Sequence, residues 1–138
     1  MDFLAKLNDH KDWGTLLLRI FTGLLFMFYG SQKLFGAFGG SGIQGFSDML
    51  STIGFPLVTF FAVLVAIVEF FGGLALILGF AARYASLFLS IVMLVAFIVV
   101  FPNGFTTWQV PFILFWTLIS LLFSGAGRYS LDRRFLIR

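Results

Sequence analysis

Glu69 is the residue in this sequence most able to do chemistry. It is the only glutamate of the chain, and it lies in the run from Phe55 to Phe80, which otherwise carries no charge. An ionisable side chain is costly in the middle of an apolar helix. Such residues normally face the interior of a bundle and mark a functional site. Two roles fit Glu69: an interhelical hydrogen bond that fixes the packing, or contact with a ligand, a proton or a partner.

Further polar side chains lie in or beside apolar runs and are candidates for binding a ligand or a proton alongside Glu69: Arg19, Tyr29, Gln32, Lys33 and Arg83. The three basic residues among them have a simpler alternative. Arg19 and Arg83 fit the basic residues that snorkel to the membrane interface, and Lys33 fits an anchor at the opposite boundary. No residue can be assigned a catalytic role.

Several kinds of chemistry are excluded by residue type. The chain has no cysteine, which excludes disulfides, thiol catalysis and thiolate metal sites. The only histidine, His10, lies outside the apolar runs. The sequence contains no nucleotide-binding loop, no catalytic triad and no metal-ligand cluster, so we expect no intrinsic cofactor and no metal. The net charge of +3 does not indicate nucleic-acid binding, because the basic residues flank apolar segments.

Composition indicates a membrane protein. Of the 138 residues, 60% are hydrophobic and only 11% are charged, and the mean hydropathy is +1.05. A soluble domain of this length could not bury so much apolar surface, whereas long uncharged runs are typical of transmembrane helices. We therefore expect residues 1–138 to form one domain in a lipid bilayer, an all-α membrane protein.

Four spans are predicted, at about 15–35, 56–80, 84–101 and 110–124. At ~1.5 Å per residue they measure about 22 to 38 Å, enough to cross a core of ~30 Å with local thinning for the fourth. Pro56 and Pro111 suit first-turn positions. The short connection 81–83 indicates a tight hairpin, so we expect an antiparallel four-helix bundle.

Basic residues predict the orientation. Eight of the nine fall on the side that carries both termini, namely Lys6, Lys11, Arg19, Arg83, Arg128, Arg133, Arg134 and Arg138. Lys33 alone falls on the other side. The positive-inside rule then places both termini in the cytoplasm. Two short amphipathic segments, one around Phe3 to Leu7 and one around Ile43 to Ile53, are predicted to lie in the membrane interface.

Helical spacing predicts which faces pack together. One face of the second span carries Ala62, Ala66, Glu69 and Gly73. One face of the first span carries Arg19, Gly23, Met27, Gly30 and Lys33 or Leu34. Small residues let helices approach closely. We therefore expect Glu69 and Arg19 to be buried. We also expect a mainly apolar cavity between the first two spans and their neighbours, rimmed by Arg19, Tyr29, Gln32 and Glu69.

Over nearly its whole length the chain resembles the DoxX family. The resemblance rests on Leu17-Leu18-Arg19 with Gly23, Phe26, Gly30 and Lys33, on Gly54-Phe55-Pro56, on the run Glu69 to Gly79, and on Ala82-Arg83 with Ala96. It implies a small four-helix protein of the bacterial inner membrane. The family is named after the small subunit of a thiosulfate:quinone oxidoreductase, and some members are associated with quinones or oxidative stress.

Three functions remain open from the sequence. The first is a membrane subunit or accessory of a quinone-linked redox system that binds a quinone-like molecule between helices. The second is a small proton-coupled transporter with Glu69 as a gate, which would need a homo-oligomer to enclose a path. The third is a non-catalytic scaffold that recruits partner enzymes through its basic tail.

Overall fold

A computed structural model describes residues 2–8 and 10–136, so Arg138, counted above for the orientation, lies outside the described residues. The described chain is helical, with no strand. Four helices are long and apolar enough to cross a membrane, which confirms the predicted all-α membrane fold. They are α2 (Lys11–Phe35), α4 (Val58–Leu78), α5 (Ala82–Val100) and α6 (Phe105–Ser124).

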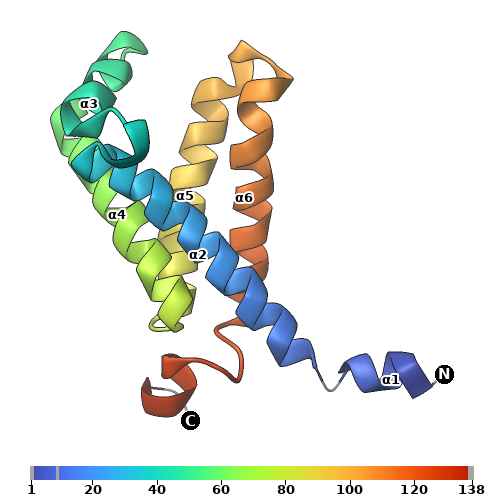
Figure 1. Cartoon of the computed structure of the whole chain (residues 1–138). Coiled ribbons are helices and arrows are strands. Elements are labelled where there is room, and N and C mark those ends of the chain that lie inside the picture. Colours follow the sequence, from blue (N-terminus) through green and yellow to red (C-terminus); the bar gives the residue numbers. More distant parts are fainter. Residues whose placement is uncertain (1, 9, 137–138) are drawn as a thin grey trace.

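Short elements connect these helices or flank them. The amphipathic segments predicted from the sequence are α1 (Asp2–Asn8) and α3 (Gly42–Thr52), and the latter follows the one-turn helix η1 (Ala37–Gly39). A second one-turn helix, η2 (Phe101–Asn103), joins α5 to α6, and η3 (Asp132–Leu136) follows the bundle. Figure 1 shows α1 and the C-terminal tail at one end of the bundle, and α3 with the α5–α6 turn at the other.

The predicted starts of the second and fourth spans, both placed at or beside a proline, differ from the observed helix starts. The fourth span begins at Phe105 rather than Val110, so Pro111 lies inside α6 and not in its first turn. The helix tolerates it because a proline removes only one backbone hydrogen bond, and neighbouring groups can adjust. Pro56 precedes α4, which begins at Val58. The first span is also longer than predicted, since α2 begins at Lys11.

Glycines set the closest approach in the bundle. α2 crosses α4 diagonally (Figure 1), and a Cβ at Gly23 would lie 2.5 Å from the carbonyl oxygen of Gly73. A Cβ at Gly30 would overlap the backbone nitrogen of Phe70. The two helices therefore touch backbone to backbone, which is the close packing that small residues permit in membranes.

The core is concentrated toward the end that carries the termini. Phe26, Leu76, Leu89 and Leu118 are fully buried where α2, α4, α5 and α6 meet. A smaller cluster holds α3 against α4 through Phe46, Leu50 and Ala62. α4 and α5 form the predicted tight hairpin. From this hairpin the two helices diverge toward the end where α3 lies (Figure 1).

Candidate functional site

The helix faces predicted from the sequence are confirmed. Ala62, Ala66, Glu69 and Gly73 are all buried on α4. Arg19 is 1% exposed and Glu69 is 3% exposed. The two side chains nevertheless occupy separate places, and each has its own partners.

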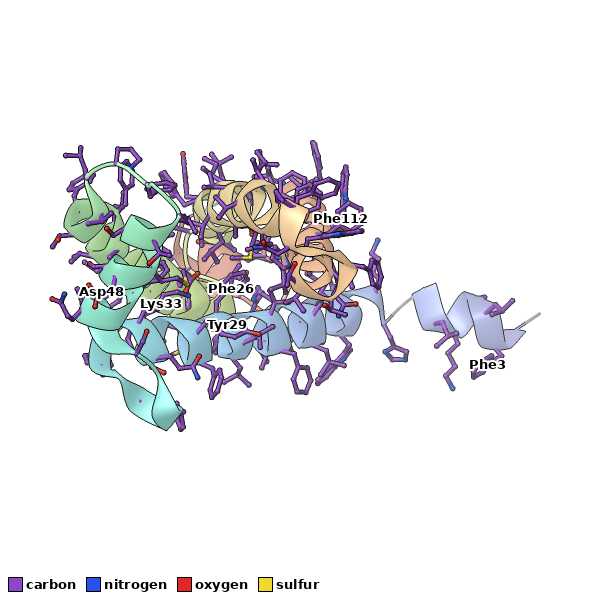
Figure 2. All side chains as sticks on the ribbon, turned by 90° about the horizontal axis from the view of Figure 1, so that it is seen from above. Phe3, Phe26, Tyr29, Lys33, Asp48 and Phe112 are labelled. Atoms are coloured by element: carbon purple, nitrogen blue, oxygen red, sulfur yellow. The ribbon has the colours of Figure 1, made fainter. Side chains whose placement is uncertain are left out.

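Glu69 forms an ion pair with Lys33. The Nζ of Lys33 donates to the Oε2 of Glu69 over 2.5 Å. The Glu69 side chain is 4% exposed and that of Lys33 is 21% exposed. Figure 2 shows Lys33 on the side of α2 that faces the other helices. Lys33 is therefore more than an anchor at the membrane boundary, because its ammonium group is paired with a buried carboxylate inside the protein.

The register of the two helices selects this pair. Gly30 lies against Phe70, the residue next to Glu69. Lys33 is nearly one turn beyond Gly30 on α2, so its side chain can reach Glu69. Arg19 is eleven residues before Gly30, which corresponds to about 16 Å along the helix. The contact between Gly30 and Phe70 thus excludes a direct pair between Arg19 and Glu69.

Two aromatic rings lie beside the ammonium group of Lys33. The Nζ of Lys33 lies 5.1 Å from the ring centre of Phe46 on α3 and 5.7 Å from that of Tyr29 on α2. A cation over an aromatic face is stabilised by the ring quadrupole. Lys33 therefore links three elements, since it contacts Tyr29 on its own helix, Phe46 on α3 and Glu69 on α4.

A cavity of about 780 Å³ opens beside the ion pair. It lies between the diverging parts of α4 and α5, with α3 and the start of α6 completing the wall. Val65, Val68 and Val92 are typical of its lining, which is almost entirely apolar. Tyr29, Lys33 and Glu69 are the three polar residues in the wall. A mainly apolar pocket with a few convergent polar groups is the usual form of a small-molecule site.

The predicted rim of the cavity is wrong for two residues. Arg19 and Gln32 do not line it. The side chain of Gln32 instead reaches the carbonyl oxygen of Phe38, 3.5 Å away in the turn after α2. The cavity also lies mainly between α4 and α5 rather than between α2 and α4, because glycine contacts close the latter interface.

Arg19 holds the C-terminal tail. Its Nε donates to the carbonyl oxygen of Leu76 over 2.6 Å, at the end of α4. The two other guanidinium nitrogens donate to the carbonyl oxygens of Ala126 and, over 2.8 Å, Tyr129. The guanidinium group thus donates hydrogen bonds to three backbone carbonyl oxygens. These contacts give Arg19 a structural role.

Asp132 was not among the candidates predicted from the sequence, yet it also holds the C-terminal tail against the spanning helices. It is 5% exposed and accepts the backbone N–H groups of Ala81 and Ala82, over 2.5 and 2.8 Å. These are the unpaired donors at the start of α5, so Asp132 acts as a helix cap supplied from the tail. Its own N–H donates to the carbonyl oxygen of Gly79. A single aspartate among basic residues near the end of the chain was the only sequence signal.

Arg83 lies apart from both groups. It is exposed at the start of α5, and its guanidinium group lies near Gly125 at the end of α6. It does not line the cavity. Of the six candidates, then, the structure brings Glu69, Lys33 and Tyr29 together and leaves Arg19, Gln32 and Arg83 elsewhere.

Comparison with known proteins agrees with the fold. The chain is 28% identical over 128 residues to "Putative oxidoreductase CatD" of Bacillus subtilis, with 91% of this chain and 90% of that protein covered. It is 32% identical over 131 residues to "Inner membrane protein YqjF" of Escherichia coli, with 89% and 92% covered. An uncharacterized membrane protein of Mycobacterium tuberculosis is 32% identical, with 86% and 79% covered.

No solved structure matches the chain. The DoxX family model matches residues 14–102, which include most of α2, all of α3, α4 and α5, and therefore the whole Lys33–Glu69 pair. The chain belongs to the DoxX family of membrane proteins.

Proposed function

We propose that this protein binds a quinone-like molecule in the cavity beside Lys33 and Glu69, as a membrane subunit or accessory of a quinone-linked oxidoreductase. The observation that carries the proposal is an ion pair placed in the wall of an otherwise apolar cavity. Two charges are expensive to bury away from water, and ionisable residues within membrane spans are normally functional.

The cavity suits a flat ring that bears carbonyl groups. Phe46, Phe61 and Phe88 supply aromatic surface in the lining. Lys33 offers N–H donors beyond the one given to Glu69, because an ammonium group has three. A quinone needs apolar walls for its ring and a donor for its carbonyl oxygen, and the cavity supplies both within one site.

The position of the cavity indicates how such a ligand would enter. Phe88, Ile91 and Val95 line the cavity and are also exposed on the surface of α5, by 54%, 50% and 40%. In a membrane this surface of a spanning helix faces lipid. The ligand therefore enters sideways from the bilayer, as expected for a lipid-soluble molecule.

The electrons would be supplied by another protein. The chain has no cysteine and so no thiol to reduce a quinone. We therefore assign it the task of holding the quinone while a partner carries out the electron transfer. The name of the Bacillus subtilis relative, "Putative oxidoreductase CatD", supports a link to redox chemistry.

The proposed setting is the bacterial inner membrane, with both termini in the cytoplasm. The Escherichia coli relative is named as an inner membrane protein, which supports the location. The basic residues near α1 and the tail support the orientation, because positive charge is concentrated in cytoplasmic segments.

Binding can be tested by titrating a short-chain benzoquinone and a naphthoquinone into protein in lipid nanodiscs, with tryptophan quenching as the signal. Wild type should show a saturable component above the linear quenching caused by quinone dissolved in lipid. Lys33→Gln should weaken that component by about 10- to 100-fold, since a lost charged hydrogen bond is worth about 1.5–3 kcal/mol. Glu69→Gln should weaken it less, because it removes only the carboxylate that positions the Lys33 ammonium group. Asp48→Asn and Lys11→Gln are matched controls at exposed positions and should leave it unchanged. Equal affinity in all five proteins would overturn the proposed site.

A further inference from the structure

The C-terminal tail is fixed to the ends of the spanning helices. Arg19 binds the carbonyl oxygens of Ala126 and Tyr129, and Asp132 caps the start of α5. The ring of Tyr129 packs on that of Trp13, with their centres 5.1 Å apart. The tail is therefore held by α2 and α5, and the basic residues that it carries have a defined position.

This anchoring presents basic groups that form no ion pair with any side chain that the structure describes. Arg128, Arg133 and Arg134 are exposed, and Arg83 is exposed at the same end of the bundle. Among the side chains that the structure describes, those of residues 3–7 and 10–135, the only ion pair is Lys33–Glu69 between α2 and α4. The nearby Asp132 is buried and already accepts two backbone N–H groups. These guanidinium groups are thus available to an external anion.

Apolar side chains are exposed in the same layer. α1 lies to the side of the bundle at the level of the tail (Figure 1), and Phe3 lies on it well away from the spanning helices (Figure 2). Phe3 and Leu4 are 74% and 70% exposed, and Phe135 beside the tail arginines is 71% exposed. Basic groups mixed with exposed aromatic and aliphatic side chains are typical of a surface that lies in a lipid headgroup layer.

We propose that this end of the protein is a binding surface for anionic phospholipids. Arg128, Arg133 and Arg134 engage the phosphate groups, and α1 inserts Phe3, Leu4 and Leu7 into the boundary between headgroups and acyl chains. A guanidinium group matches phosphate oxygens with two parallel hydrogen bonds. The apolar residues favour a lipid over an acidic protein as the partner, because a soluble partner would leave α1 uncovered.

Fluorescent phosphatidylglycerol can be titrated into the full-length protein in neutral detergent, with anisotropy as the readout and fluorescent phosphatidylcholine as the neutral comparison. Phosphatidylglycerol should bind more tightly. Each basic residue near an anionic surface contributes about a fivefold gain. The double variant R133Q/R134Q should therefore lose about 10- to 30-fold for phosphatidylglycerol and little for phosphatidylcholine.

Two controls separate specific contact from net charge. The double variant S41D/N103D also lowers the net charge by two, but at the opposite end of the molecule, and should change affinity by less than about threefold. R133K/R134K keeps the charge but loses the paired hydrogen bonds of the guanidinium groups, so it should bind phosphatidylglycerol more weakly than the wild type and more tightly than R133Q/R134Q. Because Arg133 and Arg134 are exposed, circular dichroism should show unchanged folding in every variant.

Three results would overturn the proposal. They are equal affinity for the two lipids, no loss in R133Q/R134Q, and inorganic phosphate binding as tightly as phosphatidylglycerol. If the lipids bind equally while an acidic protein partner is lost in R133Q/R134Q, the tail serves to recruit that partner instead.

Discussion

The Nζ of Lys33 lies 2.5 Å from the Oε2 of Glu69, and this pair joins α2 to α4 beside the cavity. Glu69 is nearly inaccessible, so the loss of Lys33 would leave an uncompensated charge in the interior. We expect Lys33→Gln and Glu69→Gln each to lower the free energy of unfolding by about 3–5 kcal/mol. The double variant should lose less than the sum of the two, by about 1–3 kcal/mol. Titration with a denaturing detergent, followed by circular dichroism, gives the four values. Strict additivity would show that the two charges do not interact.

The crossing of α2 and α4 depends on Gly30. A Cβ there would overlap the backbone of Phe70, and backbone cannot move aside as a side chain can. Gly30→Ala should cost about 1–3 kcal/mol of stability and should also weaken the Lys33–Glu69 pair. Gly14→Ala is the matched control on the same helix, because nothing lies within 4 Å of a Cβ at that position. It should be neutral or stabilising by up to about 1 kcal/mol. Equal effects of the two substitutions in the same detergent titration would argue against the crossing.

Arg19 should govern the order of the tail rather than ligand binding. Arg19→Met removes the donor to three carbonyl oxygens, at a cost of about 2–4 kcal/mol. Amide hydrogen exchange should accelerate in residues 126–132, while quinone quenching stays as in the wild type. Arg83→Met, at an exposed position, should change stability by less than about 0.5 kcal/mol. If amide hydrogen exchange in residues 126–132 is unchanged in Arg19→Met, then Arg19 does not hold the tail in place.

The orientation can be read from single cysteines, since the native chain has none. An impermeant thiol reagent applied to intact cells should label Ser41→Cys and Asn103→Cys, which lie at the end opposite the termini. It should not label Lys6→Cys or Arg133→Cys until the membrane is opened. Labelling of either position near the termini in intact cells would reverse the assigned orientation.

The burial of Glu69 could be predicted from the sequence, and the identity of its partner could not. Helical spacing placed Glu69 on one face with Ala62, Ala66 and Gly73, and that face is buried. At ~1.5 Å per residue from the predicted helix ends, Lys33 and Arg19 each lie about 10 Å from Glu69 in depth, so depth alone does not choose between them. The choice between them depends on the contact of Gly30 with Phe70, which is a property of how two helices cross.

The role of the tail also needed the structure. Asp132 caps a helix that begins about fifty residues earlier, and such a long-range cap leaves no local pattern. The cavity could not be predicted from the sequence either. It forms where α4 and α5 diverge, and the sequence of neither helix alone determines the angle between them. The positions of all four spans, in contrast, follow from apolar runs long enough to cross a bilayer, with errors only at their ends.

The most direct test of the proposed binding site is photolabelling with an azidoquinone in lipid nanodiscs, followed by peptide mapping. The cavity lining predicts labels in residues 61–69 of α4 and 88–100 of α5, with competition by excess unlabelled quinone. Val92→Trp, which fills the cavity, should abolish this labelling, whereas Leu122→Trp, a similar change on α6 away from the cavity lining, should not. Labels spread over all lipid-facing surfaces, without competition and without an effect of Val92→Trp, would contradict the proposal that the cavity beside Lys33 and Glu69 holds a quinone.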